Sequence, residues 1–365
     1  MYEFIRLIYK NIDKIMYLEK EPLLQAINKL DRPSTDEKKI FLFTQDIDIN
    51  SDLKLLIDIN IKKDKKFYWS QPSKDASILS FGEIFNFCTN YNNKSEINYS
   101  IKRIIDSSTH VNGTINIDVP IFVGGQNFNL NQSNSNIWKD VSVSTYHIPE
   151  FLIFQKEGCA TITFFTIIDD QFDFLNTYSY YFDYYNQILN FKKNNNTSKH
   201  QLSNKNYRIS KREFSNKITD IKKIIQRGDV TKVVLSNYCE YNYSDYIQYT
   251  EILNSLENEY PECTIFFFEN KGVFLGASPE QVLSKRGNTT FLDALAGSTQ
   301  RSSDTHQEKL NEEKLINDRK LSHEHEIVVK GITESLSKLD IEYKVGIRHI
   351  LKLKNVQHLR TRIEA

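Results

Sequence analysis

The sequence predicts an α+β protein, in which helices and antiparallel strands form separate groups along the chain. β-branched and aromatic residues concentrate in short apolar runs such as "KKIFLFTQ" and "CATITFFTI", which are typical of strands. In the second half of the chain, amphipathic helices alternate with hairpins rather than with single buried strands. This alternation disfavours a doubly wound parallel sheet.

Composition limits the classes of partner. The chain has 365 residues, which is enough for about two domains of average size. Lys+Arg and Asp+Glu both number 47, so no net charge attracts a nucleic acid or an anionic membrane. No apolar run approaches the roughly 18 residues that cross a bilayer, and the N-terminus lacks a signal-peptide pattern. We therefore expect a cytoplasmic monomer with no nucleic-acid or membrane partner.

The cysteines agree with that location. Cys88, Cys159, Cys239 and Cys263 lie far apart and form no C-x-x-C pair. Cysteines of this kind are expected to be free, reduced thiols in a cytosolic protein.

Three regions follow one another along the chain. Residues 1–189 begin with amphipathic helices over 1–30 and then show mostly strand character. Residues 190–209 are polar and rich in Asn and Lys, which predicts an exposed linker. Residues 210–365 contain sharper patterns and form the predicted core of the protein.

That core starts with a well-marked helix. Ser210 and Glu213 form a capping box, apolar residues recur on one face, and Gly228 follows the last turn. "TKVVLSNYCEY" is β-branched and predicts a strand, and a second helix should end before Pro261. "CTIFFFENKGVFLGASPE" predicts a hairpin, and "NTTFLDALAGS" another strand. A polar stretch then leads into one long helix that contains "SHEHE".

The "SHEHE" stretch (322–326) suggests a metal site, but its two histidines are wrongly spaced for one. A helix places His323 and His325 about 200° apart, so both cannot bind one ion. A zincin motif needs histidines four residues apart.

Glu324 is the stronger candidate within this stretch. It shares an apolar helical stripe with Val328, Ile332 and Leu336. A carboxylate in such a position needs an ionic partner or a bound cation. A buried salt bridge and a ligand for Mg²⁺ are both open interpretations.

Three further residues or pairs have chemical potential. Lys232 lies in a strand-like apolar run. It is either a surface lysine on an edge strand or a partly buried lysine that acts as a general base. Glu280 follows an apolar strand. It is either a surface or capping residue or a general acid. Gly297 and Ser298 in "ALAGS" form either a plain turn or a pair of anion-binding amides.

Five segments in this order resemble a known family. "GDVTKVVLS", "FLGASPEQVL", "ALAGST", "SHEHEIVV" and "VQHLRT" are similar to the signature segments of the chorismate-utilising enzymes, and most similar to those of isochorismate synthases. The resemblance is close over 210–365 and loose over 1–200. It implies a fold of large, mostly antiparallel sheets with flanking helices.

The resemblance also implies roles for individual residues, with chorismate as substrate and Mg²⁺ as cofactor. The implied roles are a general base that activates water for attack at C2 (Lys232), a general acid for the departing C4 hydroxyl (Glu280), a turn that binds a substrate carboxylate (Gly297 and Ser298), a Mg²⁺ ligand (Glu324) and a pocket histidine (His358).

Two positions imply the subtype. Lysine at 232 together with alanine at 296 resembles the members of the family that use water as nucleophile, which are isochorismate and salicylate synthases. The implied function is conversion of chorismate to isochorismate, for menaquinone or otherwise for a catechol siderophore. The alternatives are a salicylate synthase-like enzyme and a degenerate, non-catalytic binding protein.

The sequence departs from the family pattern at two places. Lys320, Leu321 and Ser322 stand where the family has a Lys-Asp-Arg run, so charge is lost beside Glu324. The chain also ends at "HLRTRIEA", whereas the family continues with a carboxylate-binding arginine and a second metal-binding glutamate. We therefore expect a C-terminally truncated enzyme, or one piece of a split gene, that is inactive alone.

Overall fold

The structure is a computed structural model that confirms the α+β class. It describes residues 25, 39–49, 52–59, 61, 63, 65–89, 94–112, 122–127, 144–169, 171–192, 202–244 and 247–365. The helices expected over residues 1–30 lie outside these residues, apart from helical Gln25. The chain divides into two compact units, Met1–Lys193 with Thr250–Ser278, and Asn194–Tyr249 with Pro279–Ala365.

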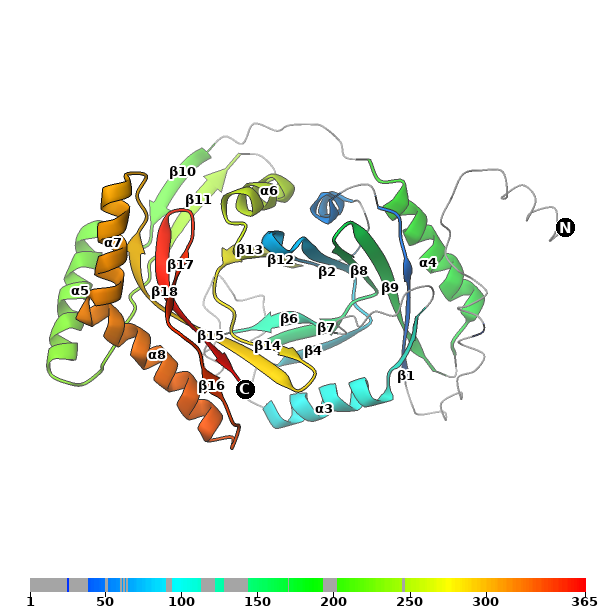
Figure 1. Cartoon of the computed structure of the whole chain (residues 1–365). Coiled ribbons are helices and arrows are strands. Elements are labelled where there is room, and N and C mark those ends of the chain that lie inside the picture. The colour runs from blue at the N-terminus through cyan, green and yellow to red at the C-terminus, as the bar shows by residue number, and fades with distance from the viewer. Residues whose placement is uncertain are drawn as a thin grey trace. The chain divides into compact units, whose positions relative to one another are not determined.

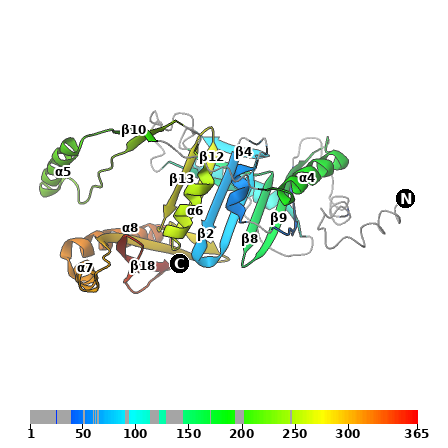
Figure 2. The same cartoon turned by 90° about the horizontal axis from the view of Figure 1, so that it is seen from above.

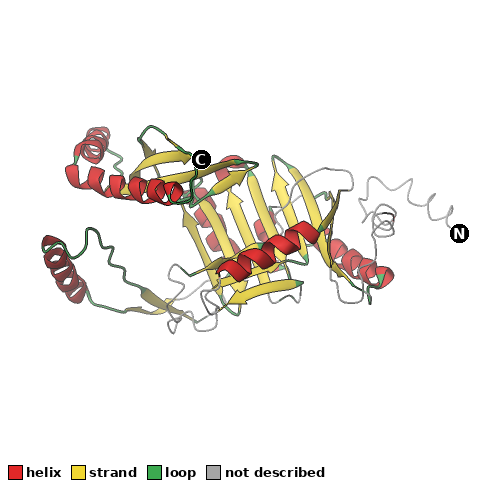
Figure 3. Ribbon diagram, turned by 90° about the horizontal axis from the view of Figure 1, so that it is seen from below, coloured by secondary structure: helices red, strands yellow, loops and turns green. Residues whose placement is uncertain are grey.

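The first unit is built on an eight-stranded sheet in the order β13-β12-β2-β3-β8-β9-β1-β5 (Figure 3). Every neighbouring pair is antiparallel except β1 and β5. The strands are β1 (Lys39–Asp46), β2 (Lys65–Gln71), β3 (Ala76–Phe81), β5 (Thr109–Asn112), β8 (Phe151–Lys156), β9 (Cys159–Ile168), β12 (Thr264–Asn270) and β13 (Val273–Ser278).

A smaller sheet in the order β4-β7-β6 provides the other side of the core. Its strands are β4 (Phe85–Thr89), β6 (Val123–Gln126) and β7 (Ser144–Ile148). One apolar cluster joins residues of both sheets, namely Ile40, Leu42, Val123, Ile148, Leu152 and Phe165. Burial of this cluster holds the two sheets together, because each removes the apolar face of the other from water.

Helices cover the large sheet. They are η1 (Leu53–Asp58), η2 (Pro72–Lys74), α3 (Lys94–Ser107), α4 (Phe174–Leu189) and α6 (Tyr249–Glu259). Tyr181 of α4 donates a hydrogen bond to the carbonyl oxygen of Phe165 at 2.5 Å. Glu257 of α6 accepts one from Tyr68 of β2 at 2.6 Å, so α6 lies on the sheet beside β2 (Figure 2). Long side chains thus tie α4 to β9 and α6 to β2.

The predicted hairpin over "CTIFFFENKGVFLGASPE" is confirmed as β12 and β13. Lys271 takes a left-handed φ of 60° in its turn, and Ile265 and Phe267 alternate into the core. The helix expected before Pro261 is also confirmed as α6. Both elements belong to the first unit, although they follow the predicted linker in sequence.

The second unit contains a five-stranded sheet with β14-β15-β18-β16 in order and β17 also paired to β18. Helices α7 and α8 pack against it (Figure 1). Its elements are β14 (Ser284–Arg286), β15 (Thr289–Gln300), α7 (Thr305–Asn317), α8 (Arg319–Ser337), β16 (Lys344–Val345), β17 (His349–Lys352) and β18 (Val356–Glu364). The long helix expected to contain "SHEHE" is confirmed as α8, and the polar stretch before it forms a helix of its own, α7. Asp318 separates the two helices with an extended backbone at ψ 120°.

The rest of the second unit is a hairpin-like pair of strands that encloses a helix: β10 (Leu202–Tyr207), α5 (Lys211–Gln226) and β11 (Cys239–Tyr243). The capping box at Ser210 and Glu213 is confirmed. Two predictions were wrong here. Part of the expected linker forms β10, and the strand expected from Thr231 begins only at Cys239.

Two further observations concern the expected location. None of the helices in the described ranges has the length and apolar character needed to cross a bilayer. Cys159, Cys239 and Cys263 are free thiols, and the side chain of Cys88 lies outside the described residues.

Candidate active site

The "ALAGS" segment forms a bulge inside β15. Gly297 has a φ of +79°, and the pairing of β15 with β18 shifts register between Ala296 and Ser298. The expected turn at a strand end was therefore wrong, since β15 continues to Gln300. The physical reason is that β18 pairs with β15 on both sides of the glycine, so the ladder resumes after one unpaired residue.

Gly297 also lies against the backbone of α8. A Cβ atom at this position would stand 3.0 Å from the carbonyl oxygen of Leu321. The absence of a side chain thus allows the first turn of α8 to approach the bulge closely.

The bulge brings Ser298 and His358 together. They face each other across β15 and β18, and Ser298 Oγ lies 2.7 Å from His358 Nδ1. Burial lowers the pKa of His358 below its ordinary value. Two residues that the sequence analysis selected from separate motifs are therefore hydrogen-bonded.

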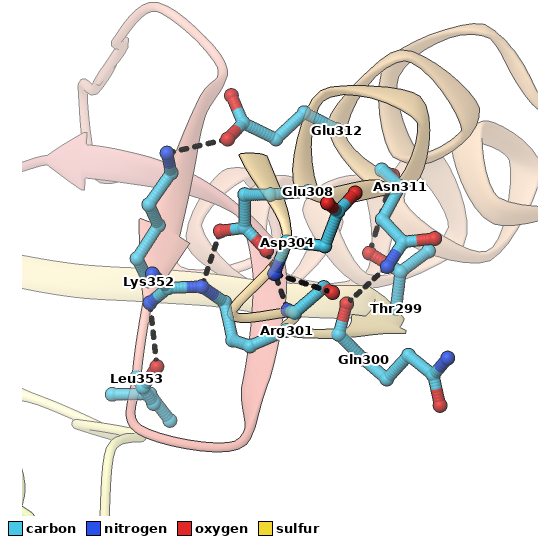
Figure 4. Close-up of polar contacts among 10 residues, drawn as sticks. Thr299, Gln300, Arg301, Asp304, Glu308, Asn311, Glu312, Lys352 and Leu353 are labelled. Carbon is cyan, nitrogen blue, oxygen red and sulfur yellow. Dashed lines mark hydrogen bonds and ion pairs between the residues drawn. The ribbon is translucent and has the colours of Figure 1, made fainter. Parts of the chain in front are cut away.

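Polar contacts anchor the chain just beyond the bulge (Figure 4). Arg301 forms an ion pair with Glu308 of α7 and donates to the carbonyl oxygen of Leu353 at 2.7 Å. The Ser302 amide donates to Glu308 at 2.8 Å, and this bond and the charge of Arg301 lower the pKa of that carboxyl group. The end of β15 is thus held between α7 and the β17–β18 turn.

Glu324 occupies a half-exposed position on α8. Its side chain is 27% exposed and lies 3.5 Å from the Lys320 ammonium, one turn earlier. The interpretation as an inward-facing, buried carboxylate was therefore wrong. The buried face of α8 is centred on Leu321, His325 and Leu336 instead, so Glu324 lies at its edge.

His325 is the residue that the sequence analysis missed. It is only 2% exposed, with Nδ1 3.2 Å from the Ala296 carbonyl oxygen and Nε2 2.8 Å from Thr361 Oγ1. The helical spacing of Leu321 and His325 would have identified it as inward-facing. His323 is exposed, so the prediction that the two histidines do not share a site is confirmed.

Lys232 and Glu280 are both exposed. Lys232 lies in an irregular segment between α5 and β11, where neighbouring Val234 is 81% exposed. Its predicted strand was wrong, because a strand needs a hydrogen-bonded neighbour and none of the described strands pairs with this segment. Glu280 follows the end of β13 at Ser278, as expected, and precedes β14.

The comparison with family models matches nearly all of the described chain. Residues 25–365 match the model described as "chorismate binding enzyme". The chain belongs to this family.

Several of the similar proteins within the family are isochorismate synthases, and others are anthranilate synthases. The chain is 29% identical over 143 residues to isochorismate synthase MenF of Pasteurella multocida. This alignment covers 39% of this chain and 33% of that protein. It is 23% identical over 313 residues to MenF of Bacillus subtilis, which covers 82% of this chain and 65% of that protein. The fold is similar to that of the solved menaquinone-specific isochorismate synthase MenF of Escherichia coli, with a TM-score of 0.71 and 18% identity. The match covers 94% of this chain and 76% of that chain.

The side chains near α8 include an oxygen donor of the kind that a hard cation prefers, but they offer few ligands. Mg²⁺ is commonly held by one or two carboxylates together with water and substrate oxygens. Among the described residues no group of three or more His, Cys, Asp or Glu side chains could hold a metal ion. Glu324 offers one carboxylate of the type that holds Mg²⁺, and water and a substrate would have to supply the other oxygens.

Proposed function

We propose that this protein acts as an isochorismate synthase, which converts chorismate to isochorismate. The observation that carries the proposal is the bulge of β15. It places Gly297 against α8 and Ser298 against His358, on the strands and helix that bear the family segments. Backbone amides around a glycine of this kind are suited to bind a carboxylate, and chorismate is a dicarboxylate.

In the proposed reaction, water forms a bond to C2 as the bond between C4 and its hydroxyl breaks and the ring double bonds shift. Lys232, as a neutral amine, takes the proton that water loses. Glu280, as a carboxylic acid, gives a proton to the departing hydroxyl, so the reaction releases one water for each water consumed. An acid and a base on the two sides of an allylic displacement each contribute on the order of 10²- to 10⁴-fold.

Glu324 is the residue that would hold Mg²⁺. When bound, the ion would supply positive charge beside the ring carboxylate of the substrate. Lys320 is paired with Glu324 in this structure and would have to release it.

We propose further that residues 1–365 turn over chorismate poorly by themselves. Among the described residues no group of three or more His, Cys, Asp or Glu side chains could hold the ion, and Lys232 lies in an exposed, irregular segment rather than on a strand. A general base held so loosely loses the benefit of orientation, which is a large part of such catalysis.

The test uses the protein purified from its own cells, at the length it has there, with chorismate and Mg²⁺. Chromatography of the products should reveal isochorismate. Lys232→Ala should lower kcat at least about 100-fold, because water loses its base. The matched control is Lys222→Ala, which removes an exposed lysine of α5 and should leave the rate unchanged.

Other products would contradict the proposal. Salicylate with pyruvate would indicate the salicylate synthase-like alternative, and binding of chorismate without any product would indicate a non-catalytic binder. The same assay on residues 1–365 should give no product above background. A rate from this chain that Lys232→Ala abolishes would overturn the proposed inactivity and support the reaction.

The pathway and setting are part of the proposal. Similarity to MenF proteins, one of which is described as menaquinone-specific, supports a role in menaquinone synthesis. The free thiols support a cytoplasmic location, and we propose that the enzyme acts there as a monomer. Deletion of the gene should lower cellular menaquinone in iron-replete medium. A loss confined to siderophore production would contradict this assignment.

A further inference from the structure

His325 connects three elements of the second unit. It projects from α8, its Nδ1 lies 3.2 Å from the Ala296 carbonyl oxygen of β15, and its Nε2 lies 2.8 Å from Thr361 Oγ1 of β18. The residue is 2% exposed, so water does not compete for these contacts. One side chain thus links a helix to both central strands of the sheet.

The two partners determine how the ring is protonated. A carbonyl oxygen can only accept, so Nδ1 carries the proton and donates to Ala296. Nε2 then accepts from the hydroxyl group of Thr361, which is itself 3% exposed. Both ring nitrogens are therefore occupied, which excludes His325 as a metal ligand in this arrangement.

The first of these contacts lies next to the bulge. Ala296 precedes Gly297, and Gly297 lies against the carbonyl oxygen of Leu321, one helical turn before His325. Leu321 and His325 share the inward face of α8, so two successive turns of the helix contact the bulge. Glu324, next to His325, is carried by the same turn.

We propose that His325 is a positioning residue: by joining α8 to β15 at the bulge, it sets the spacing between the Glu324 carboxylate and the anion-binding backbone amides of the bulge. This inference rests on the proposed function, in which the ion held by Glu324 and the backbone amides of the bulge both bind one rigid, dianionic substrate. Misplacement of one group by about 1 Å can cost on the order of 100-fold in rate. Loss of a residue that orients a metal ligand typically costs about 10- to 100-fold in affinity or activity.

The first variants separate hydrogen bonding from packing. His325→Leu introduces an apolar side chain of similar bulk and removes both hydrogen bonds. Thr361→Val keeps the shape of the threonine and removes the partner of Nε2. His325→Gln supplies an N–H donor and an oxygen acceptor in place of the two ring nitrogens and should rescue the function. His323→Leu is the matched control, since it is exposed on the same helix.

Kinetics of the protein from its own cells provide the first measurement. For His325→Leu and Thr361→Val, kcat/KM for chorismate should fall about 10- to 100-fold, and half-saturation by Mg²⁺ should require a similarly higher concentration. His325→Gln and His323→Leu should stay within about threefold of the wild type. If His325→Leu and Thr361→Val lower only the melting temperature and leave these constants unchanged, His325 is a packing residue and the inference is wrong.

Amide hydrogen exchange of residues 1–365 provides a measurement that needs no activity. Exchange at Ser298 and Thr299 should accelerate at least tenfold in His325→Leu, relative to Phe267 of the other unit. Unchanged exchange at the bulge would overturn the inference. If exchange accelerates but the wild-type protein makes no isochorismate, the contact is real and its catalytic role falls together with the proposed function.

Discussion

At the scale of single residues, Gly297 combines two requirements. Its φ of +79° lies in the left-handed region, and a Cβ atom would stand 3.0 Å from the carbonyl oxygen of Leu321. Other residue types strain the backbone in that region by about 1–2 kcal/mol. The close approach adds a steric cost that neither strand nor helix can relieve without moving.

Gly287 is a natural control for Gly297, because it has a φ of +57° but no atom within 4 Å of a Cβ position. Gly287→Ala should lower the free energy of unfolding by about 1 kcal/mol, from backbone strain alone. Gly297→Ala should lower it by about 2–3 kcal/mol, because the clash is added. Urea unfolding of both variants measures the difference. Equal losses would show that α8 can retreat from the bulge at no cost.

The residues of "SHEHE" show what a local pattern can resolve. The angle between consecutive helical positions sufficed to separate His323 from His325. The same helical periodicity left the inward face uncertain by one position, because the apolar stripe is broad enough to include either Glu324 or His325. The sheet decided between them, since only His325 finds both an acceptor at Ala296 and a hydroxyl group at Thr361.

At the scale of elements, one residue both ends α7 and begins α8. Asp318 accepts a hydrogen bond from the Leu321 amide at Oδ1, at 3.0 Å, while its own amide donates to the Lys314 carbonyl oxygen at 2.9 Å. The side chain therefore caps the helix turn that lies against the bulge of β15.

Asp318→Ala should lower the free energy of unfolding by about 1 kcal/mol, because the Leu321 amide loses its acceptor. Asp318→Asn keeps an acceptor oxygen and should cost only a few tenths of a kcal/mol. Thermal and urea unfolding of the two variants provide the measurement. Equal effects of alanine and asparagine would indicate that the charge near the helix N-terminus matters rather than the cap.

A strand was predictable together with its partner only where that partner lies nearby in sequence. The hairpin of β12 and β13 is encoded by alternation and by a turn at Lys271 and Gly272. The run "TKVVLS" has equal strand propensity but no paired strand among the described residues, and it stays irregular. β-propensity reflects fit to neighbouring strands, so it does not by itself create a strand.

At the scale of the whole molecule, the first unit buries a histidine between its two sheets. His147 of β7 is fully buried near Phe268 of β12, and neither ring nitrogen has a hydrogen-bond partner among the described residues. Burial and, to a smaller extent, the charge of Lys65 lower the pKa of His147 to about 4, while the charge of Glu83 opposes the shift. The residue is therefore neutral in the folded protein at pH 7.

Because the folded pKa lies below the ordinary value of about 6.5, the unfolded chain binds the proton first as pH falls. The stability of the first unit should be complete above about pH 6.5 and decline toward pH 4. Between pH 7.5 and pH 5, His147 should account for a loss of about 2 kcal/mol. His147→Leu should lack this part of the pH dependence in urea unfolding. Parallel stability curves for variant and wild type would show that the buried ring is not the cause.

Some features were determined by the sequence alone. The capping box of α5, the end of α6 before Pro261, the alternation of β12 and each single family segment are encoded within about ten neighbouring residues. Helical and strand periodicity, caps and turns act over that distance, so they can be interpreted without knowing what packs against them.

The tertiary structure decided the rest. It assigned residues 250–278 to the sheet of the first unit, made the Gly297 segment a bulge rather than a turn, and placed His325 inward instead of Glu324. Each outcome depends on a partner that is remote in sequence, such as β2 for β12 or β18 for β15. Strand pairing and burial are contacts between distant segments, and no local pattern specifies which segments will meet.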